Sequence, residues 1–129
     1  MAVTNLGLKA ITGLVGNIDT QTAFGYLALG TSATAFAAAQ TGLQAEITDT
    51  GLARAAATGA TSEQTTVADD TLQLTKTWTA TGSKTIAEVG VFNAASSGVM
   101  LARTVLGTAR VLESSFTYGL TYKVKFAAA

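Results

Sequence analysis

Residues 116–126 alternate strictly between apolar and polar side chains, and this run limits the fold more than any other feature of the chain. The apolar members of the run are Phe116, Tyr118, Leu120, Tyr122, Val124 and Phe126. A period of two places all of them on one face of an extended β-strand and is incompatible with a helix. At about 3.4 Å per residue the strand is about 37 Å long, longer than most strands. It therefore either crosses the whole domain or extends toward a partner.

Other segments upstream also have the pattern of strands. Residues 72–80 alternate in the same way, and residues 85–93 and 98–106 are β-rich runs on either side of a short Ala-Ala-Ser-Ser turn. Residues 31–43, rich in alanine and threonine, are expected to form a loop with one helical turn at 36–40. Several strands without helices between them predict an all-β fold, an antiparallel β-sandwich or a jelly-roll-like barrel.

The one predicted helix lies at the N-terminus, over residues 4–15. Leu6, Ala10 and Leu14 recur at the i, i+4, i+8 spacing, and Thr4 or Asn5 can serve as N-cap. We therefore divide the chain into a helical arm, residues 1–16, and a single β-sandwich domain, residues 17–129.

Two roles for the arm are open. It either plugs one end of its own domain or docks on a neighbouring subunit. In the second case its apolar side chains are the candidate contacts with a capsid or another subunit. These residues are Leu6, Leu8, Ile11, Leu14 and Val15.

The composition indicates a subunit of an assembly. The net charge is zero, mean hydropathy is +0.37, and only 12% of residues are charged, about half the usual share of roughly a quarter. So apolar a chain is expected to bury surface against other copies or a larger partner. Without a basic patch we expect no nucleic-acid partner, and without a run of eighteen apolar residues or a secretory signal we expect no membrane partner.

The inventory of reactive side chains is small. The chain contains no cysteine and no histidine, which excludes disulfides and thiolate nucleophiles and removes the commonest general base and metal ligand. Asp69 and Asp70 are the only adjacent acidic pair and are expected to form a solvated turn. We predict no catalytic residue, no cofactor, no metal site and no small-molecule substrate. Trp78 and the aromatic residues of 116–126 are expected in the core rather than on a sugar-stacking platform.

Glu88 and Arg103 are two opposite charges in apolar surroundings, one in each arm of the 85–106 hairpin. A four-residue turn at 94–97 places Asn93 opposite Gly98 and Glu88 directly opposite Arg103. The pair is then a structural cross-strand ion pair. Its rival role is an electrostatic contact to a neighbouring subunit.

The hairpin reads Thr-Ile-x-Glu-x-Gly-Val-Phe-Asn-Ala and then Gly-x-x-Leu-Ala-Arg. The residues that carry this pattern are Thr85, Ile86, Glu88, Gly90, Val91, Phe92, Asn93, Ala94, Gly98, Leu101, Ala102 and Arg103. Two earlier blocks accompany it, with Arg54 following them. These blocks contain Tyr26, Ala28, Gly30, Thr31, Thr34 and Ala35, then Leu43 and Glu46. The pattern resembles small virion structural proteins of tailed bacteriophages, except that those proteins more often have Leu and Asp at the positions of Val91 and Asn93.

The resemblance implies a non-enzymatic virion protein. Proteins of this length in that family decorate the head as cement subunits, and the chain ends shortly after its last strand without a fibre shaft. We therefore expect a capsid decoration protein that binds the major capsid protein lattice as a dimer or trimer. It would be made in the host cytoplasm and end on the capsid surface of the virion.

Two alternatives are open. A tail-fibre, tail-collar or baseplate attachment protein shares the hairpin pattern. A carbohydrate-binding adhesin module is the rival from another class, and it requires an exposed aromatic platform that includes Trp78.

Overall fold

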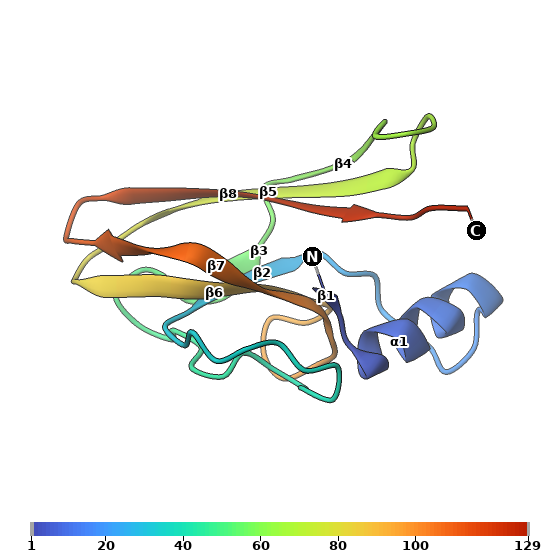
Figure 1. The fold of residues 1–129 in the computed structure, drawn as a ribbon, viewed down its shortest axis with the longest axis horizontal. Helices are drawn as coiled ribbons and strands as arrows, with labels where there is room; N and C mark the ends of the chain where they lie inside the picture. The colour runs from blue at the N-terminus through green and yellow to red at the C-terminus, as the bar shows by residue number, and fades with distance from the viewer. Residues whose placement is uncertain (1, 129) are drawn as a thin grey trace.

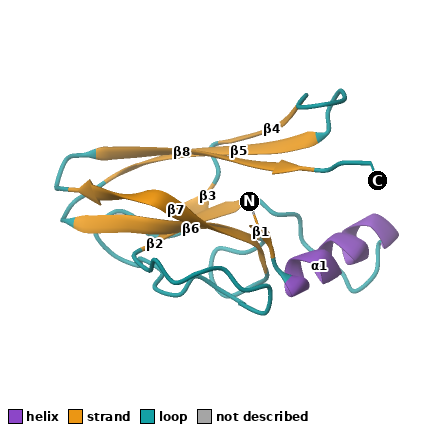
Figure 2. Cartoon of the chain, viewed as in Figure 1, coloured by secondary structure: helices purple, strands orange, loops and turns teal. Residues whose placement is uncertain are grey.

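The computed structural model describes residues 2–128, which form two facing antiparallel sheets and one helix (Figures 1 and 2). The five-stranded sheet has the order β1-β7-β6-β2-β3, and the three-stranded sheet has the order β4-β5-β8. The elements are β1 (Ala2–Val3), α1 (Asn5–Gly16), β2 (Tyr26–Gly30), β3 (Ala55–Ala56), β4 (Gly59–Glu63), β5 (Thr71–Thr79), β6 (Lys84–Phe92), β7 (Met100–Leu112) and β8 (Thr117–Lys125).

The all-β expectation is confirmed, in its sandwich form. Strands β5 and β8 pair without interruption from Thr71 opposite Lys125 to Thr79 opposite Thr117. The apolar and polar residues of the two strands alternate between an inner and an outer face, as predicted. The inward-facing residues Leu74, Trp78, Tyr122 and Val124 are buried in the main core between the two sheets.

The five-stranded sheet is covered on both faces. Its inner face packs against the three-stranded sheet through residues such as Leu29 and Val89. On its outer face Phe92, Met100 and Ala28 form a second small cluster against Leu43, in the long connection between β2 and β3. This connection, residues 31–54, runs beneath the sheet in Figure 2. Double coverage explains why β6 is buried without interruption from Ile86 to Phe92 instead of alternating.

The 31–54 connection contains no helix. The helical turn expected at 36–40 is wrong, because only a turn at residues 38–39 forms, with the N–H of Gln40 donating to the carbonyl of Ala37. The segment instead takes its conformation from side chains of the sheet that it covers.

The predicted hairpin register is wrong by two residues. Asn93 pairs with Val99 rather than Gly98, so the turn is one residue longer than expected, with positive φ at Ser97 and Gly98. A bulge between Val91 and Phe92 adds a second residue to β7. As a result Glu88 faces Val105, and Arg103 faces Gly90.

Two one-residue shifts leave every side chain on its expected face. One shift alone moves a strand's side chains to the opposite face of the sheet, and the second moves them back. Glu88 and Arg103 therefore remain on the same face as diagonal neighbours, within reach of each other.

The N-terminal segment is bound to its own sandwich. Strand β1 pairs with β7, with Ala2 opposite Arg103, and α1 follows directly with Thr4 as its N-cap. The Thr4 hydroxyl accepts from the N–H of Gly7 and donates to the carbonyl of Met100 at 2.6 Å. The helix thus plugs one end of its own domain. The boundary of an arm at residue 16 stays a prediction, as does docking on a neighbour.

Helix α1 buries small residues and exposes large ones. Its buried positions are Gly7, Ala10 and Gly13, so that Ala10 is buried among the three residues Leu6, Ala10 and Leu14 that share the helical spacing. A Cβ atom on Gly7 would lie 2.4 Å from the carbonyl oxygen of Leu101, so only glycine permits this approach of helix to strand. The leucines consequently lie at the margin of the contact or outside it.

Candidate functional site

A fully buried ion pair lies on the outer face of the five-stranded sheet. The Arg103 Nε atom donates to the Glu88 Oε2 atom at 2.5 Å, and neither side chain is exposed to solvent. Both groups are further satisfied by the 31–54 connection. Glu88 accepts from the backbone N–H groups of Gln44 and Ala45, at 3.1 and 2.7 Å.

Arg103 completes the network from the other side. Its guanidinium donates to the carbonyl of Thr34 at 2.8 Å and to the Gln40 side chain at 3.3 Å. Among the described residues no buried side-chain nitrogen or oxygen lacks a hydrogen-bond partner. Since every charged atom of the pair is occupied, its role is to fix the connection onto the sheet.

Glycine makes room for this pair. Gly30 lies opposite Glu88 on β2, and a Cβ atom there would lie within 2.3 Å of the carboxylate. Gly90 lies opposite Arg103 on β6. Each charged residue thus has a glycine as its direct neighbour on one side, and Gly30 leaves the space that the Glu88 carboxylate fills.

A second arginine clamps the far end of the connection. Arg54 donates to both carboxylate oxygens of Glu46, at 3.0 and 2.6 Å, and to the carbonyls of Ala94 and Ser97 in the β6–β7 turn. Its guanidinium lies 3.5 Å from the centroid of the Phe92 ring. The sequence placed this arginine only at the start of a strand and gave no signal for the clamp.

Asp70 is not the solvated turn residue expected from the sequence. Its side chain is nearly buried and accepts from the backbone N–H groups of Thr65, Thr66 and Val67 and from the Thr71 hydroxyl. Burial alone would raise the pKa of Asp70, but these four donors outweigh it and hold the pKa well below the usual range. The carboxylate closes the turn between β4 and β5.

This hydrogen bonding predicts a specific pH dependence. Because the folded-state pKa of Asp70 lies below its ordinary value of 3.8, the carboxylate stabilises the fold at every pH above that value. The contribution is lost as pH falls further. Asp70→Asn is expected to lower the thermal midpoint at pH 7, and the difference from wild type should shrink below about pH 4. Asp69→Asn, on the exposed neighbour, is the control. Equal midpoints for wild type and Asp70→Asn at pH 7 would contradict the assignment.

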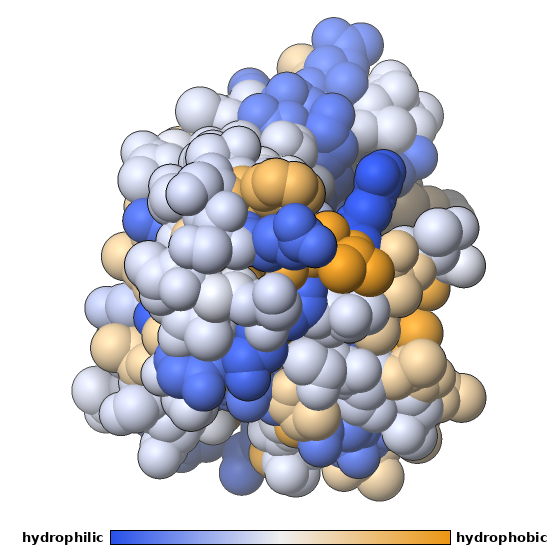
Figure 3. All heavy atoms as spheres, turned by 90° about the vertical axis from the view of Figure 1, so that its left-hand side faces the viewer, coloured by the Kyte–Doolittle hydropathy of each residue, from blue (hydrophilic) through white to orange (hydrophobic). Residues whose placement is uncertain are grey.

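The most apolar surface feature is at the helical end of the sandwich. A groove of about 480 Å³ lies between α1 and the end of β8, with apolar side chains throughout. It is lined by Ile11, Leu14, Val15, Ala23, Phe24, Leu72, Leu101 and Phe126. Figure 1 shows α1 and the C-terminus at this same end. Figure 3 shows the opposite end, where hydrophilic and neutral side chains dominate around one small apolar patch.

Three of the candidate contact residues, Ile11, Leu14 and Val15, line this groove, and Leu6 and Leu8 lie on the same helix. Val15 is 85% exposed and Leu8 is 56% exposed, Leu6 and Leu14 are exposed to a smaller degree, and Ile11 packs against the core at the groove wall. Ile18 and Phe126, also exposed, extend the same region. We call this set the terminal apolar surface: Leu6, Leu8, Ile11, Leu14, Val15, Ile18 and Phe126.

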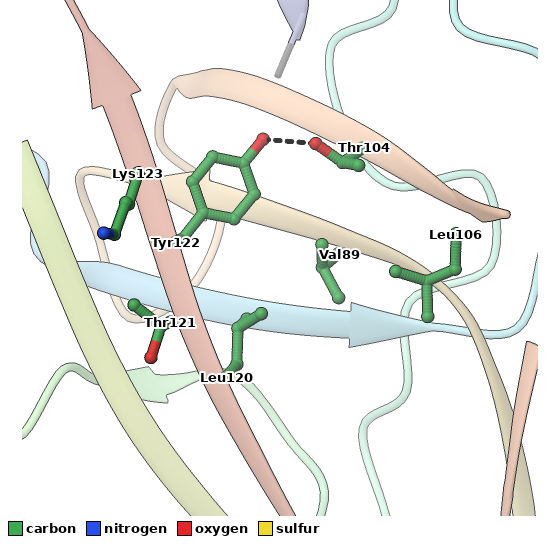
Figure 4. Close-up of a pocket in the computed structure, with 7 residues that line it drawn as sticks. All are labelled: Val89, Thr104, Leu106, Leu120, Thr121, Tyr122 and Lys123. Atoms are coloured by element: carbon green, nitrogen blue, oxygen red, sulfur yellow. Dashed lines mark hydrogen bonds between the residues drawn. The ribbon is translucent and has the colours of Figure 1, made fainter. Parts of the chain in front are cut away.

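A second, shallower groove opens between the edge strands of the two sheets (Figure 4). It has a volume of about 270 Å³ and is lined by Val89 of β6, by β7 residues and by β8 residues. The Thr104 and Tyr122 hydroxyls share a hydrogen bond of 2.8 Å across it. Burial raises the pKa of Tyr122, so the phenol keeps its proton across the neutral range.

Trp78 is a core residue. Its side chain is buried and the indole N–H donates to the carbonyl of Ala53 at 2.9 Å. An aromatic platform for sugars that includes Trp78 is therefore not present on this surface.

Within residues 2–128 no three histidine, cysteine, aspartate or glutamate side chains gather into a group that could hold a metal ion. The single described helix is too short to cross a bilayer. No protein-family model matches the chain, and no curated protein matches it in sequence.

Proposed function

We propose that this protein is a non-enzymatic virion structural protein that decorates a bacteriophage capsid. In this proposal the terminal apolar surface binds the major capsid protein lattice. The observation that carries the proposal is the arrangement of α1, which buries Gly7, Ala10 and Gly13 and leaves leucine and valine in solvent. A helix that served only its own core would do the reverse.

Large exposed apolar residues next to an apolar groove are typical of interaction surfaces. No charged residue lines the groove beside the terminal apolar surface, and the cores of protein interfaces are depleted in charge. This surface exists only in the folded subunit, so a partner that covers it binds the folded state and not the unfolded one. If the subunit in turn binds only the assembled shell, it stabilises that shell against disassembly by mass action.

The surface is also held rigidly. The Thr4 cap and the pairing of β1 with β7 tie the start of α1 to the sheet, and the left-handed Asn17 ends the helix. A pre-organised surface loses less conformational entropy on binding than a flexible arm does.

The resemblance to phage virion proteins supports the proposal from another direction. The first block and the hairpin are far apart in sequence, yet Thr34 of the first block meets Glu88 and Arg103 of the hairpin in one hydrogen-bonded network, and Gly30 provides the space for it. The shared pattern thus describes one structural unit, the connection fixed to the sheet. This unit builds the scaffold, and the proposed contacts lie elsewhere.

Point substitutions test the proposal more sharply than removal of residues 1–16, since Ala2 and Val3 pair with β7 and Ala10 belongs to the core. Val15→Glu and Leu8→Glu are expected to leave the thermal midpoint unchanged and to weaken binding to undecorated capsids by about tenfold or more. Binding is measured by co-sedimentation of purified protein with capsids.

Val111→Glu is the matched control. Val111 is 66% exposed but lies at the far end of β7, away from α1. It is expected to bind capsids like the wild type. If both Val15→Glu and Leu8→Glu bind capsids to the same occupancy as the wild type, the proposed contact is wrong.

A further inference from the structure

Strand β8 leaves one edge of the three-stranded sheet open along its whole length. It pairs with β5 from Thr117 to Lys125 in an unbroken register, and no other described segment pairs with it. The chain contains no proline, and no bulge interrupts this ladder. An open, regular edge of nine residues presents unpaired backbone N–H and C=O groups to any incoming strand.

The edges of the five-stranded sheet are covered in part or irregular. Strand β1 covers β7 at Ala102 and Arg103, and the pairing of β7 with β6 is irregular between Val105 and Arg110. Strand β3 and a bridge from Glu46 cover the outer edge of β2. Native proteins commonly blunt exposed edges in these ways. The other open edge, β4, has only five residues.

We propose that β8 pairs antiparallel with β8 of a second copy of this chain, about a two-fold axis at Thr121. The two three-stranded sheets then become one sheet of six strands. The register that pairs the whole of β8 with itself is centred on Thr121. This inference goes beyond the proposed function, which concerns only the contact with the capsid, and it gives a structural basis for the dimer expected from the sequence.

The outer face of β8 is compatible with itself in this register. Lys125 faces Thr117 of the second copy, Lys123 faces Gly119, and Thr121 faces its own equivalent. No lysine therefore meets another lysine, and like charges directly opposite each other are the main electrostatic obstacle to pairing two identical strands.

The inner face is compatible as well. Tyr118 faces Val124 and Leu120 faces Tyr122, which are pairs of the aromatic and aliphatic kinds that stabilise sheets. Just beyond the strand ends, Phe116 of one copy faces Phe126 of the other. These phenylalanines are 51% and 49% exposed in the single chain, and pairing gives each an aromatic neighbour.

The groove in Figure 4 opens beside this edge. Leu106 and Leu120 line it and are only partly buried in the single chain. A strand added to β8 lies next to these side chains and removes part of their apolar surface from water. A second copy of the chain thus pairs the open backbone groups of β8 and buries part of the side chains of Leu106 and Leu120.

Charge-swapped variants at the two-fold axis test the inference by sedimentation velocity on the isolated protein. The wild type is expected to be a dimer at micromolar concentrations. Thr121→Lys and Thr121→Glu, at an exposed position, should each be folded monomers, because each places like charges face to face. An equimolar mixture of the two variants should regain the dimer.

Thr61→Lys on β4 is the matched control, since Thr61 is an exposed threonine on the opposite edge of the same sheet. It should remain a dimer. A monomeric wild type, failure of the mixture to associate, or dissociation by Thr61→Lys as complete as by Thr121→Lys would each overturn the inference.

A cross-link reports the register directly. Because the chain has no cysteine, Thr121→Cys carries a single thiol, and mild oxidation should convert most of it to a disulfide-linked dimer, unlike Thr61→Cys. Equal cross-linking of both variants would overturn the register. These measurements use no capsids. A monomer that still decorates capsids refutes this inference alone, and a dimer that does not bind them refutes the proposed function alone.

Discussion

Arg103→Leu is expected to lower the free energy of unfolding by about 3–5 kcal/mol. The substitution leaves the Glu88 carboxylate fully buried without its ion-pair partner, with only two backbone N–H groups as donors. It also frees the carbonyl of Thr34 and the Gln40 side chain from the guanidinium. A domain of this size has a total stability of about 5–15 kcal/mol, so the loss brings it close to unfolding.

Urea denaturation followed by circular dichroism measures this effect. The control is Lys84→Met, which removes a surface ion pair between the Lys84 Nζ and Asp49 Oδ1 atoms, 3.1 Å apart. This substitution should lower the free energy of unfolding by no more than about 1 kcal/mol. Similar losses for the two variants would show that burial adds nothing to the Glu88–Arg103 pair.

The double variant Glu88→Gln, Arg103→Leu separates the two parts of the cost. Neutralising the carboxylate removes the uncompensated buried charge, so the double variant should be more stable than Arg103→Leu alone. A double variant less stable than Arg103→Leu would contradict the electrostatic explanation.

Arg54→Lys is expected to cost about 2–3 kcal/mol although the charge is retained. An ammonium group cannot reproduce the two-pronged contact with Glu46, donate at the same time to the carbonyls of Ala94 and Ser97, and lie flat over Phe92. The end of the 31–54 connection should loosen from the β6–β7 turn.

Thermal unfolding gives the size of this loss, and amide hydrogen exchange locates it. Faster exchange is expected in residues 46–54 and 94–98. Arg110→Lys makes the same chemical change at an exposed position of β7 and should be neutral within about 0.5 kcal/mol. An Arg54→Lys protein as stable as Arg110→Lys would show that the clamp contributes only its charge.

The sequence was most informative where one face of a strand packs and the other faces solvent. The alternation in β5 and β8 correctly indicated both strands and the buried Leu74, Trp78, Tyr122 and Val124, because one face packs on the core. It was wrong for Phe116 and Phe126, which lie just beyond the ends of β8 and are exposed. The same rule could not describe β6, whose second face is covered by a connection without regular structure. Periodicity reports local burial and carries no information about which distant segment provides the cover.

The hairpin shows why register is harder to predict than strands. The composition of the turn predicted its position in the sequence but not its length. No sequence pattern indicated the bulge next to Phe92. The predicted partners were wrong, yet the charges lie on a shared face because the two shifts add to an even number. The Arg54 clamp went unpredicted because its acceptors come from two segments far apart in sequence, Glu46 and the β6–β7 turn.

The sequence predicted the helix but not which of its faces is buried. Spacing favoured Leu6, Ala10 and Leu14, and two glycines counted only as weak helix formers. In the structure Gly7 and Gly13 are buried, because Leu101 of β7 approaches Gly7, and Ile18 and Gln21 approach Gly13, too closely for a side chain. The exposed leucines that result are the basis of the proposed capsid contact.

Labelling intact virus particles with an antibody against this chain tests the central proposal most directly. The particles would be those of the phage that, under this proposal, encodes the protein, viewed by electron microscopy with a gold-conjugated second antibody. Decoration of the head predicts label spread over the capsid shell. Label confined to the tail tip or collar, with none on the shell, would contradict the capsid role and favour attachment of a tail fibre.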